Sequence, residues 1–138
     1  MEKTVKLKII TVHGIFFEDD IVSINLRTKT GGEITLLPNH APFVSNIDVC
    51  KMKVVLPANI KKLFYIGVGL LYVENNIIRI ITDDILGADN IDIERARKEQ
   101  ELLLAELSKI QNVKERAVFE YRLRKVINRI EVYNNKNK

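Results

Sequence analysis

The spacing of apolar residues in this chain changes once, at the acidic, glycine-containing stretch 83–90. Before this stretch apolar residues alternate with polar ones, as Val5, Leu7 and Ile9 do with two lysines. After it, apolar residues recur at intervals of three and four. Period two is typical of half-buried strands and period 3.6 of amphipathic helices. The chain therefore divides into a strand region and a helical region.

The strand region holds several short runs separated by turn residues such as Gly31-Gly32 and Asn75-Asn76. It leaves no room for crossover helices, which favours an antiparallel β-sandwich or barrel. We expect this domain at residues 1–84. A linker at 85–90 then leads to a helix, which Asp89 or Asn90 would cap.

The helical region contains two apolar stripes with a break around Asn112. Two amphipathic helices joined by a short turn are expected to pack as an antiparallel hairpin, at residues 91–133. The polar tail 134–138 is expected to be frayed. The stripes consist of Ile93, Ala96, Gln100, Leu103, Leu107 and Ile110, and of Phe119, Leu123, Val126, Ile130 and Tyr133.

The net charge of +4 is unevenly distributed. Residues 1–90 carry ten Lys or Arg and ten Asp or Glu, whereas residues 91–138 carry twelve and eight. A basic C-terminal third favours an acidic partner or a polyphosphate ligand. Nucleic acid is not expected, because the predicted sheet lacks a basic stripe interleaved with aromatic residues.

The sequence offers little catalytic chemistry. Its histidines are His13 and His40, and no Cys/His cluster, phosphate loop or nucleophile elbow is present, so neither an enzyme nor a metal site is expected. Cys50 lies in an alternating run and is interpreted as a core residue. Asp83 and Asp84 are interpreted as solvated turn residues. Without a signal peptide or an apolar run of about 18 residues, we expect a cytosolic chain.

Three motifs, in this order, carry a resemblance to a known family. They are Gly32-Glu-Ile-Thr-Leu-Leu-Pro-Asn-His-Ala-Pro42, Ile66-Gly-Val-Gly-Leu-Leu-Tyr-Val73 followed by Ile77-Ile-Arg-Ile-Ile-Thr-Asp83, and Ile91-Asp-Ile-Glu-Arg-Ala96. Together they resemble the epsilon subunit of F-type ATP synthases, over almost the whole chain. The bacterial type is favoured, because the N-terminus lacks a mitochondrial transit sequence.

The resemblance implies a non-catalytic subunit in the central stalk of a proton-translocating F-type ATP synthase. Its sandwich would bind the gamma subunit and the c-ring, and would couple rotation of the ring to ATP synthesis. Its C-terminal helices would reach the alpha and beta subunits and inhibit ATP hydrolysis. The subunit would be peripheral at the cytoplasmic face of the cell membrane, attached only through the complex, and would require no cofactor.

The family also suggests individual contact residues. Glu33 matches the acid of the turn that faces the c-ring, and His40 matches the loop histidine near gamma. Pro38 and Pro42 restrict the backbone around His40, which favours a rigid contact surface over a general base. On the second helix, basic residues would favour an acidic surface on a catalytic subunit: Arg116, Arg122 and Arg124.

Some members of the family bind regulatory ATP on the hairpin. The matching residues here are Ile91, Asp92, Arg95, Ala96, Lys125 and Arg129. Lys125 replaces an arginine, which keeps the charge but loses the fork that fits phosphate. Asp92 and Arg95 also have local interpretations, as a helix-start acid and its pairing partner. A free-standing ATP-sensing module is the alternative function, and such a module would act without gamma.

Overall fold

The computed structural model describes residues 2–137, which form ten strands followed by two α-helices. Two short 3-10 helices, η1 (Pro57–Asn59) and η2 (Ala88–Asn90), interrupt this order, and the α-helices are α1 (Ile93–Leu107) and α2 (Val113–Asn135). The strands are β1 (Val5–Thr11), β2 (Gly14–Ile21), β3 (Ser23–Thr28), β4 (Gly32–Leu36), β5 (Phe43–Ile47), β6 (Cys50–Leu56), β7 (Ile60–Ile66), β8 (Gly69–Glu74), β9 (Ile77–Ile81) and β10 (Ile85–Gly87). The predicted fold class, a β-sandwich followed by a two-helix hairpin, is confirmed.

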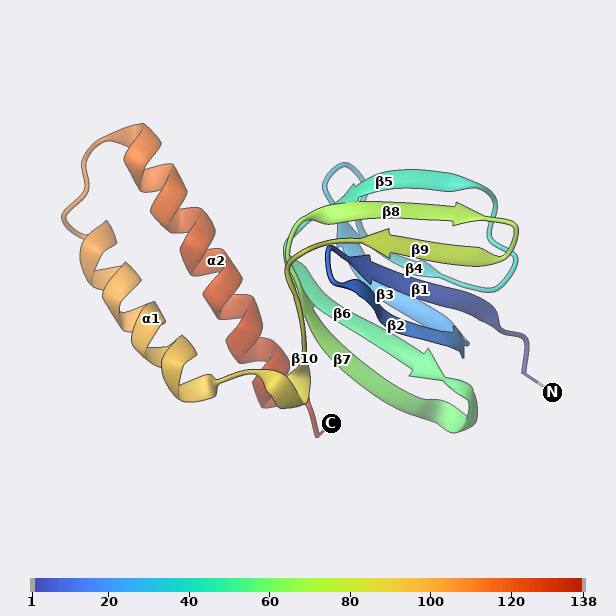
Figure 1. The fold of residues 1–138 in the computed structure, drawn as a ribbon. Helices are drawn as coiled ribbons and strands as arrows, with labels where there is room; N and C mark the ends of the chain where they lie inside the picture. Colours follow the sequence, from blue (N-terminus) through green and yellow to red (C-terminus); the bar gives the residue numbers. More distant parts are fainter. Residues whose placement is uncertain (1, 138) are drawn as a thin grey trace.

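The strands form one sheet that curls into two facing layers (Figure 1). Its order is β10-β7-β6-β3-β5-β8-β9-β1-β2, and β4 pairs with β3. The bend lies where β3 meets β5 through the single pair Thr28 and Ile47. The two ends of the sheet approach each other through aromatic side chains, since the rings of Phe17 on β2 and Phe64 on β7 lie 5.6 Å apart.

Alternation along the strands fills the space between the layers. On β1, Val5, Leu7 and Ile9 are buried while Lys6 and Lys8 point outward. Because successive side chains of a strand point to opposite faces, one apolar face per strand is enough to build the core. This core contains no residue from either α-helix.

One strand pair departs from the predicted antiparallel arrangement. β1 lies parallel to β9, with Leu7 opposite Ile78 and Ile9 opposite Ile80. Parallel neighbours need a long connection, and the intervening strands of the sandwich supply it. Side-chain alternation is the same in both arrangements, so the sequence pattern could not distinguish them.

The segment expected to be a linker, 85–90, is ordered structure. Ile85 to Gly87 form β10, which pairs with β7, and residues 88–90 form η2. Ile85 and Ala88 are buried, and this burial explains why the segment follows the sheet edge. The hairpin therefore starts from a fixed position on the sandwich.

The caps of the two helices fall on Asp92 and Asn112. The Asp92 side chain accepts a hydrogen bond from Arg95 N at 3.2 Å, so the prediction that Asp89 or Asn90 caps α1 is wrong. Those two residues belong to η2, which ends before α1 begins. Asn112 accepts from Glu115 N at 3.1 Å and starts α2, where the sequence predicted the break.

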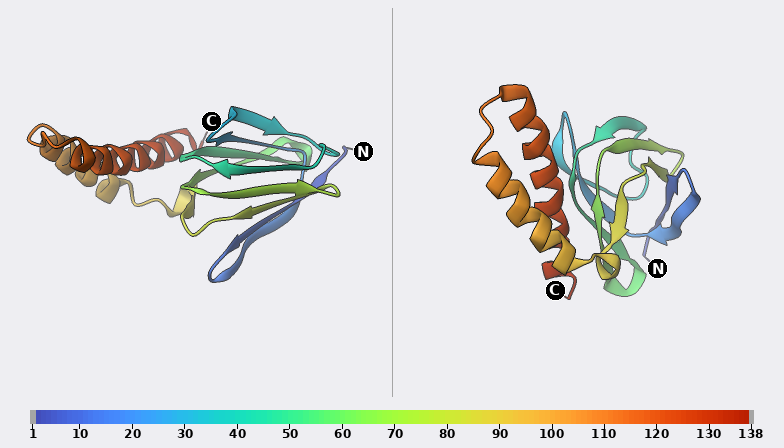
Figure 2. Two further views of the ribbon diagram at one scale, coloured as in Figure 1. Left: turned by 90° about the horizontal axis from the view of Figure 1, so that it is seen from above. Right: turned by 60° about the vertical axis from the view of Figure 1, so that its left-hand side comes forward.

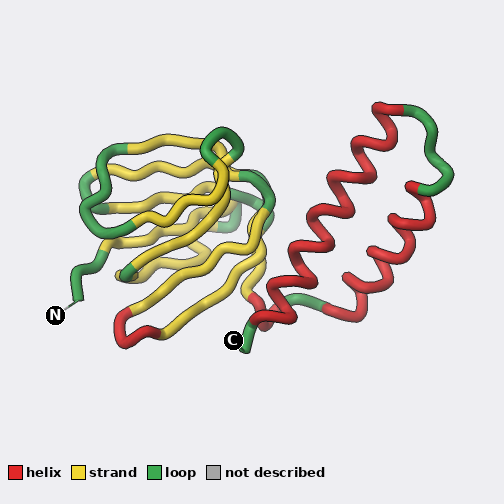
Figure 3. Tube along the Cα trace, turned by 180° about the vertical axis from the view of Figure 1, so that it is seen from behind, coloured by secondary structure: helices red, strands yellow, loops and turns green. Residues whose placement is uncertain are grey.

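Helix α2 is longer than expected and ends at Asn135, two residues into the predicted frayed tail. The side-chain amide of Asn135 donates from Nδ2 to the carbonyl oxygen of Glu131 at 2.7 Å, which supports this last turn. The hairpin contacts the sandwich along the C-terminal half of α2, while the α1–α2 turn projects away (Figures 2 and 3). Docking thus uses one side of one helix.

Candidate functional site

A surface pocket of about 460 Å³ opens where η2, α1 and α2 meet. Five of the six residues predicted to bind ATP line it: Ile91, Asp92, Arg95, Ala96 and Arg129. Leu86, Asn90 and Glu99 complete the lining. Its size falls in the range of small-molecule sites, which is roughly 300–1,000 Å³.

The first turn of α1 forms one wall of this pocket. Asp92 is the helix cap, so its carboxylate is partly engaged by the backbone N–H of Arg95. Ala96 is buried against α2, and a small residue here lets the helices approach. The Arg95 side chain is exposed and forms no ion pair within residues 2–137. Arg95 is therefore free to meet an anion.

Arg129 on α2 forms the opposite wall and has several neighbours. Its Nη1 lies 3.8 Å from Glu99 Oε2, and its Nη2 lies 4.0 Å from Asp84 Oδ1. The guanidinium stacks over the Tyr65 ring at 4.8 Å from the centroid, a cation–π geometry. Its buried Nε has no hydrogen-bond partner among the described residues. Both ion pairs are long, so the guanidinium is shared and incompletely satisfied.

Lys125, the sixth predicted residue, does not line the pocket. Its Nζ lies 3.5 Å from Asp84 Oδ2 and 5.4 Å from the centroid of the Tyr121 ring. Lys125 sits one helical turn before Arg129, which places both cations beside Asp84. The structure thus links Lys125 to the site through Asp84.

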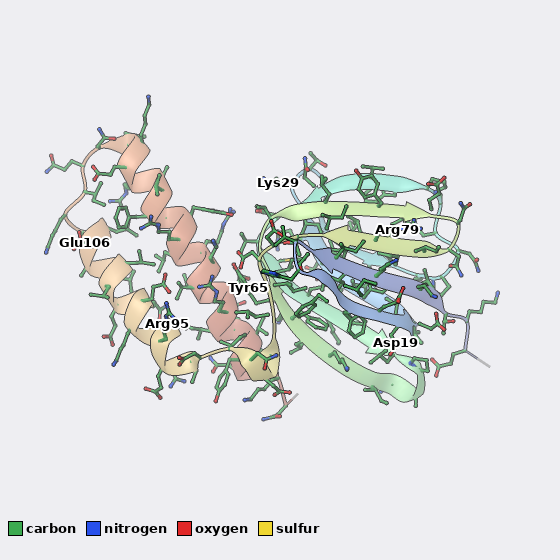
Figure 4. The ribbon with its side chains drawn as sticks, viewed as in Figure 1. Asp19, Lys29, Tyr65, Arg79, Arg95 and Glu106 are labelled. Atoms are coloured by element: carbon green, nitrogen blue, oxygen red, sulfur yellow. The ribbon has the colours of Figure 1, made fainter. Side chains whose placement is uncertain are left out.

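Tyr65 and Asp84 connect the site to the sheet. Figure 4 shows Tyr65 between the sheet and α2, with Arg95 further out on α1. The Tyr65 hydroxyl donates to Asp84 Oδ2 at 2.8 Å. Burial, and then this hydrogen bond, raise the pKa of Tyr65 above its ordinary range, so the hydroxyl stays a donor.

The charges of the pocket lining are balanced. Arg95 and Arg129 face Asp92 and Glu99, two positive against two negative side chains. An anion such as a phosphate would therefore have to compete with the chain's own carboxylates. The donor set fits a phosphate group, with reduced strength because these carboxylates remain close.

The structure separates the two residues predicted to contact the rotor. Glu33 is exposed near the start of β4, opposite Arg27, in a shallow depression beside α2. His40 is exposed in the loop that follows the other end of β4, and its Nδ1 donates to the Ala41 carbonyl at 2.7 Å. Glu33 and His40 therefore belong to different surfaces.

The loop that carries His40 is tied to the β8–β9 turn. Asn39 has a φ of 64° and donates its N–H to the Asn76 side chain at 2.8 Å. Asn76 in turn donates to the Thr4 carbonyl at 3.0 Å. The His40 ring meets Phe43 edge-on, with centroids 5.9 Å apart. These contacts reduce the freedom of the loop.

The three arginines predicted to meet a catalytic subunit have different surroundings. Arg116 pairs with Glu120 at 3.0 Å and donates to the Leu107 carbonyl at 2.9 Å, across the α1–α2 turn. Arg124 pairs with Asp48 of the sandwich at 3.3 Å. Arg122 stacks on Phe119 and has no acidic partner within residues 2–137. In this arrangement Arg122 is the most available of the three.

Sequence reasoning missed Tyr65, Asp84 and Glu99. Asp84 was interpreted as a solvated turn residue, yet its carboxylate accepts a hydrogen bond from Tyr65 and forms an ion pair with Lys125. Glu99 lies three and four residues from Ala96 and Arg95 on α1, a spacing that could have placed it beside the motif. No sequence signal pointed to Tyr65, because alternation only predicts its side of β7.

Three further features bear on the sequence analysis: metal-binding groups, membrane-spanning helices and the state of Cys50. Among residues 2–137 no group of three His, Cys, Asp or Glu residues is arranged to hold a metal ion. Within the same residues no helix is both long and apolar enough to cross a bilayer. Burial raises the pKa of Cys50 to about 11, which agrees with its interpretation as a core residue.

The sequence has clear relatives. Residues 4–88 match the family model of the ATP synthase delta/epsilon chain β-sandwich domain. The ATP synthase epsilon chain of Mycoplasmopsis pulmonis is 35% identical, with 94% of this chain and 93% of the relative covered. That of Clostridium novyi is 33% identical, with 96% and 99% covered. The sodium ion specific epsilon chain of Propionigenium modestum is 27% identical, with 94% and 93% covered.

Solved structures share the fold. A chain of the Euglena gracilis mitochondrial ATP synthase, in its OSCP/F1/c-ring structure, superposes with a TM-score of 0.80 at 20% identity, covering 91% of this chain and 78% of that one. A chain of the Tetrahymena thermophila mitochondrial ATP synthase central stalk and c-ring gives 0.67 at 12% identity, with 96% and 98% covered. With the sandwich, the hairpin and the sequence relatives in agreement, the chain belongs to the ATP synthase epsilon chain family, whose members are non-catalytic subunits.

Proposed function

We propose that this chain couples rotation of the c-ring to ATP synthesis, as the subunit that joins the ring to gamma, with protons as the coupling ion. It would work at the cytoplasmic face of the cell membrane, held there by the complex. The observation that supports this most is that the sandwich and the hairpin are separate units. The sandwich has a complete core of its own, so it can stay bound while the hairpin changes position.

Glu33 and His40 are proposed as two separate contacts. Both are exposed and lie on different surfaces, which suits a subunit held between two partners. Glu33 would accept charge-assisted hydrogen bonds from c-ring loops, and His40 would meet gamma from a loop with little freedom. Pre-ordered surfaces lose less conformational entropy on binding.

The C-terminal hairpin is proposed to restrain ATP hydrolysis when it leaves the sandwich and reaches alpha and beta. Its docking surface is small: a cluster of Val49, Tyr65, Ala88, Ile91 and Val132 with partly buried neighbours. Arg124, whose partner in the docked form is Asp48, would then be released to an acidic surface, where Arg116 and Arg122 would join it.

Deletion of residues 91–138 from the assembled complex tests this proposal. Because the sandwich core holds no hairpin residue, the truncated subunit is expected to fold and to stay bound. ATP hydrolysis is expected to rise about five-fold or more, as for an allosteric coupling of at least about 1 kcal/mol. The measurement is steady-state hydrolysis by purified complex that retains gamma and the truncated chain. Unchanged hydrolysis in such a complex would refute the inhibitory role.

A free-standing ATP-sensing module remains the second candidate, favoured by the pocket beside α1. It is distinguished by copurification, since a stalk subunit isolates with gamma and the catalytic subunits. In either case we propose that regulatory ATP binds this pocket, with its phosphates near Arg95 and Arg129.

Replacing Arg95 by alanine tests the ATP site. The wild-type chain is expected to bind ATP weakly, on the order of 1 mM, because Asp92 and Glu99 oppose the phosphates. Arg95→Ala is expected to weaken binding about ten-fold, as for the loss of one charge-assisted contact. Calorimetry with millimolar ATP measures both. Arg97→Ala is the control, since Arg97 is exposed on the same helix outside the pocket. No heat and no shift in melting temperature with wild-type protein would reject the site.

A further inference from the structure

The Asp84 carboxylate, on the sandwich, lies close to cationic side chains of α2. The Tyr65 hydroxyl donates to Oδ2 at 2.8 Å, and Lys125 Nζ lies 3.5 Å from the same oxygen. Arg129 Nη2 lies 4.0 Å from Oδ1. One carboxylate therefore faces two cations of α2.

The sandwich itself fixes the backbone of Asp84. The Gly67 N–H donates to the Asp84 carbonyl at 2.7 Å, and the Asp84 N–H donates to Thr82 Oγ1 at 3.2 Å. A Cβ at position 67 would overlap the Asp84 side chain, so glycine leaves the room it occupies. The Thr82 hydroxyl is anchored in turn, donating to the Val68 carbonyl at 2.8 Å. Asp84 is thus positioned independently of the hairpin.

Arg129 belongs to two sites at once. It pairs with Asp84 on the sheet side and lines the pocket with Glu99 on the α1 side. Both pairs are near the limit of direct contact, at 4.0 and 3.8 Å. A guanidinium shared by two carboxylates at these distances can still pair with a third anion, but it then loses part of its pairing with the first two.

We propose that Asp84 is an internal competitor for phosphate. It holds Lys125 and Arg129 against the sheet, and an anion in the pocket has to take Arg129 away from it. The inference rests on the ATP site proposed above, to which it adds a positioning residue on the sandwich. Asp84 therefore strengthens docking of the empty hairpin and weakens nucleotide binding.

The opposing signs of these two effects are the signature of competition. A residue that only supported the local structure would lower both docking and affinity when removed. When phosphate neutralises Arg129, docking still has the Asp48–Arg124 pair and the apolar cluster. The hairpin can therefore remain on the sandwich while Arg129 exchanges its partner, from Asp84 to the bound phosphate.

The test compares Asp84→Asn with Asp83→Asn in the full-length chain. Both remove one negative charge from neighbouring positions, but Asp83 Oδ1 accepts from Val12 N at 3.1 Å and faces the β1–β2 turn. Asp84→Asn is expected to bind ATP roughly two- to five-fold more tightly, the range for loss of one competing ion pair. Asp83→Asn is expected to match wild type. Calorimetry gives the affinities.

A second measurement examines docking without nucleotide. In Asp84→Asn, hydrogen exchange of the α2 amides around Lys125 and Arg129 is expected to accelerate about three-fold or more, while the sandwich strands exchange as before. Tyr65→Phe keeps the ring under Arg129 and removes the hydroxyl that donates to Asp84 Oδ2, so the carboxylate pairs more strongly with the two cations and smaller shifts in the two opposite directions are expected. Tyr65→Phe replaces Asp84→Asn in both measurements if Asp84→Asn does not fold.

The two readouts separate the two proposals. If neither wild type nor any variant binds ATP, the proposed nucleotide site and the competition are both refuted. Hydrogen exchange then tests only whether Asp84 holds the hairpin on the sandwich. If ATP binds but Asp84→Asn binds it equally or more weakly than wild type, the competition is refuted. Unchanged exchange in α2 refutes the clamp.

Discussion

Gly69→Ala is expected to lower the free energy of unfolding of the sandwich by about 1–3 kcal/mol, the range for overpacking a closely packed interior. A Cβ at this position would lie 2.6 Å from the Ile81 carbonyl oxygen and 3.0 Å from the Thr82 Cβ. The first of these atoms belongs to the backbone of β9, the strand paired with β8, so it cannot move without disturbing the ladder. Chemical denaturation of the isolated chain measures the loss.

Gly87→Ala is the matched control for this prediction. The nearest atom to its added Cβ is Asn90 Nδ2 at 3.5 Å, an ordinary contact, and the backbone there is extended. A change below about 1 kcal/mol is expected, in either direction. If Gly69→Ala left the denaturation midpoint as close to wild type as Gly87→Ala does, the close approach of β8 and β9 would not be needed for stability.

The two glycines of the Gly67-Val-Gly69 motif therefore permit different close contacts. The missing side chain of Gly69 lets the backbone of β9 approach, and that of Gly67 leaves space for the Asp84 carboxylate. From sequence, the motif supported only the resemblance and a turn. Its physical meaning depended on which atoms lie opposite each missing Cβ, and spacing alone does not contain that information.

The sandwich was predictable because each strand keeps one face in a single core. Met52 and Val54 are fully buried while Lys51 and Lys53 are exposed, as the alternation required. The parallel pairing of β1 with β9 was not predictable, because alternation reports burial and carries no strand direction.

The docking side of α2 was not predicted, for a related reason. The apolar stripe identified on this helix includes Leu123 and Val126, which pack in the cluster shared with α1. Docking to the sheet uses Tyr121 and Val132 on a second side of the same helix, together with Tyr133 at the end of the predicted stripe. A single stripe at helical spacing identifies one buried face, and a helix packed between two neighbours has more.

The candidate site was partly predictable through the resemblance. The motif residues Asp92 and Arg95 and the distant Arg129 do line one pocket. Asp84 and Tyr65 enter from the sandwich, and their proximity depends on the curl of the sheet. Such contacts between separate units have no periodic signature in the sequence.

Val132→Asp is expected to release the hairpin from the sandwich. Val132 is 0% exposed and packs in the cluster with Val49, Tyr65, Ala88 and Ile91. An unpaired carboxylate buried there costs at least about 3 kcal/mol, more than so small a docking surface is expected to supply. Because the sandwich core is separate, its own unfolding is expected to change little. Hydrogen exchange is expected to rise throughout α2 and to stay constant in the strands.

Val118→Asp provides the same substitution on the same helix at a side chain that is 51% exposed, and wild-type exchange is expected there. In the assembled complex either the released hairpin or the docked hairpin could be the form that inhibits ATP hydrolysis. The two possibilities predict opposite changes in hydrolysis for Val132→Asp. If the released hairpin is the form that reaches the catalytic subunits, Val132→Asp lowers ATP hydrolysis, whereas deletion of residues 91–138 raises it. If Val132→Asp raises hydrolysis as the deletion does, the docked hairpin is the inhibitory form, and the extended form is not. Because Val132 packs in the docking cluster against the sandwich and the deletion removes every hairpin contact, this pair of measurements assigns the restraint to one position of the hairpin.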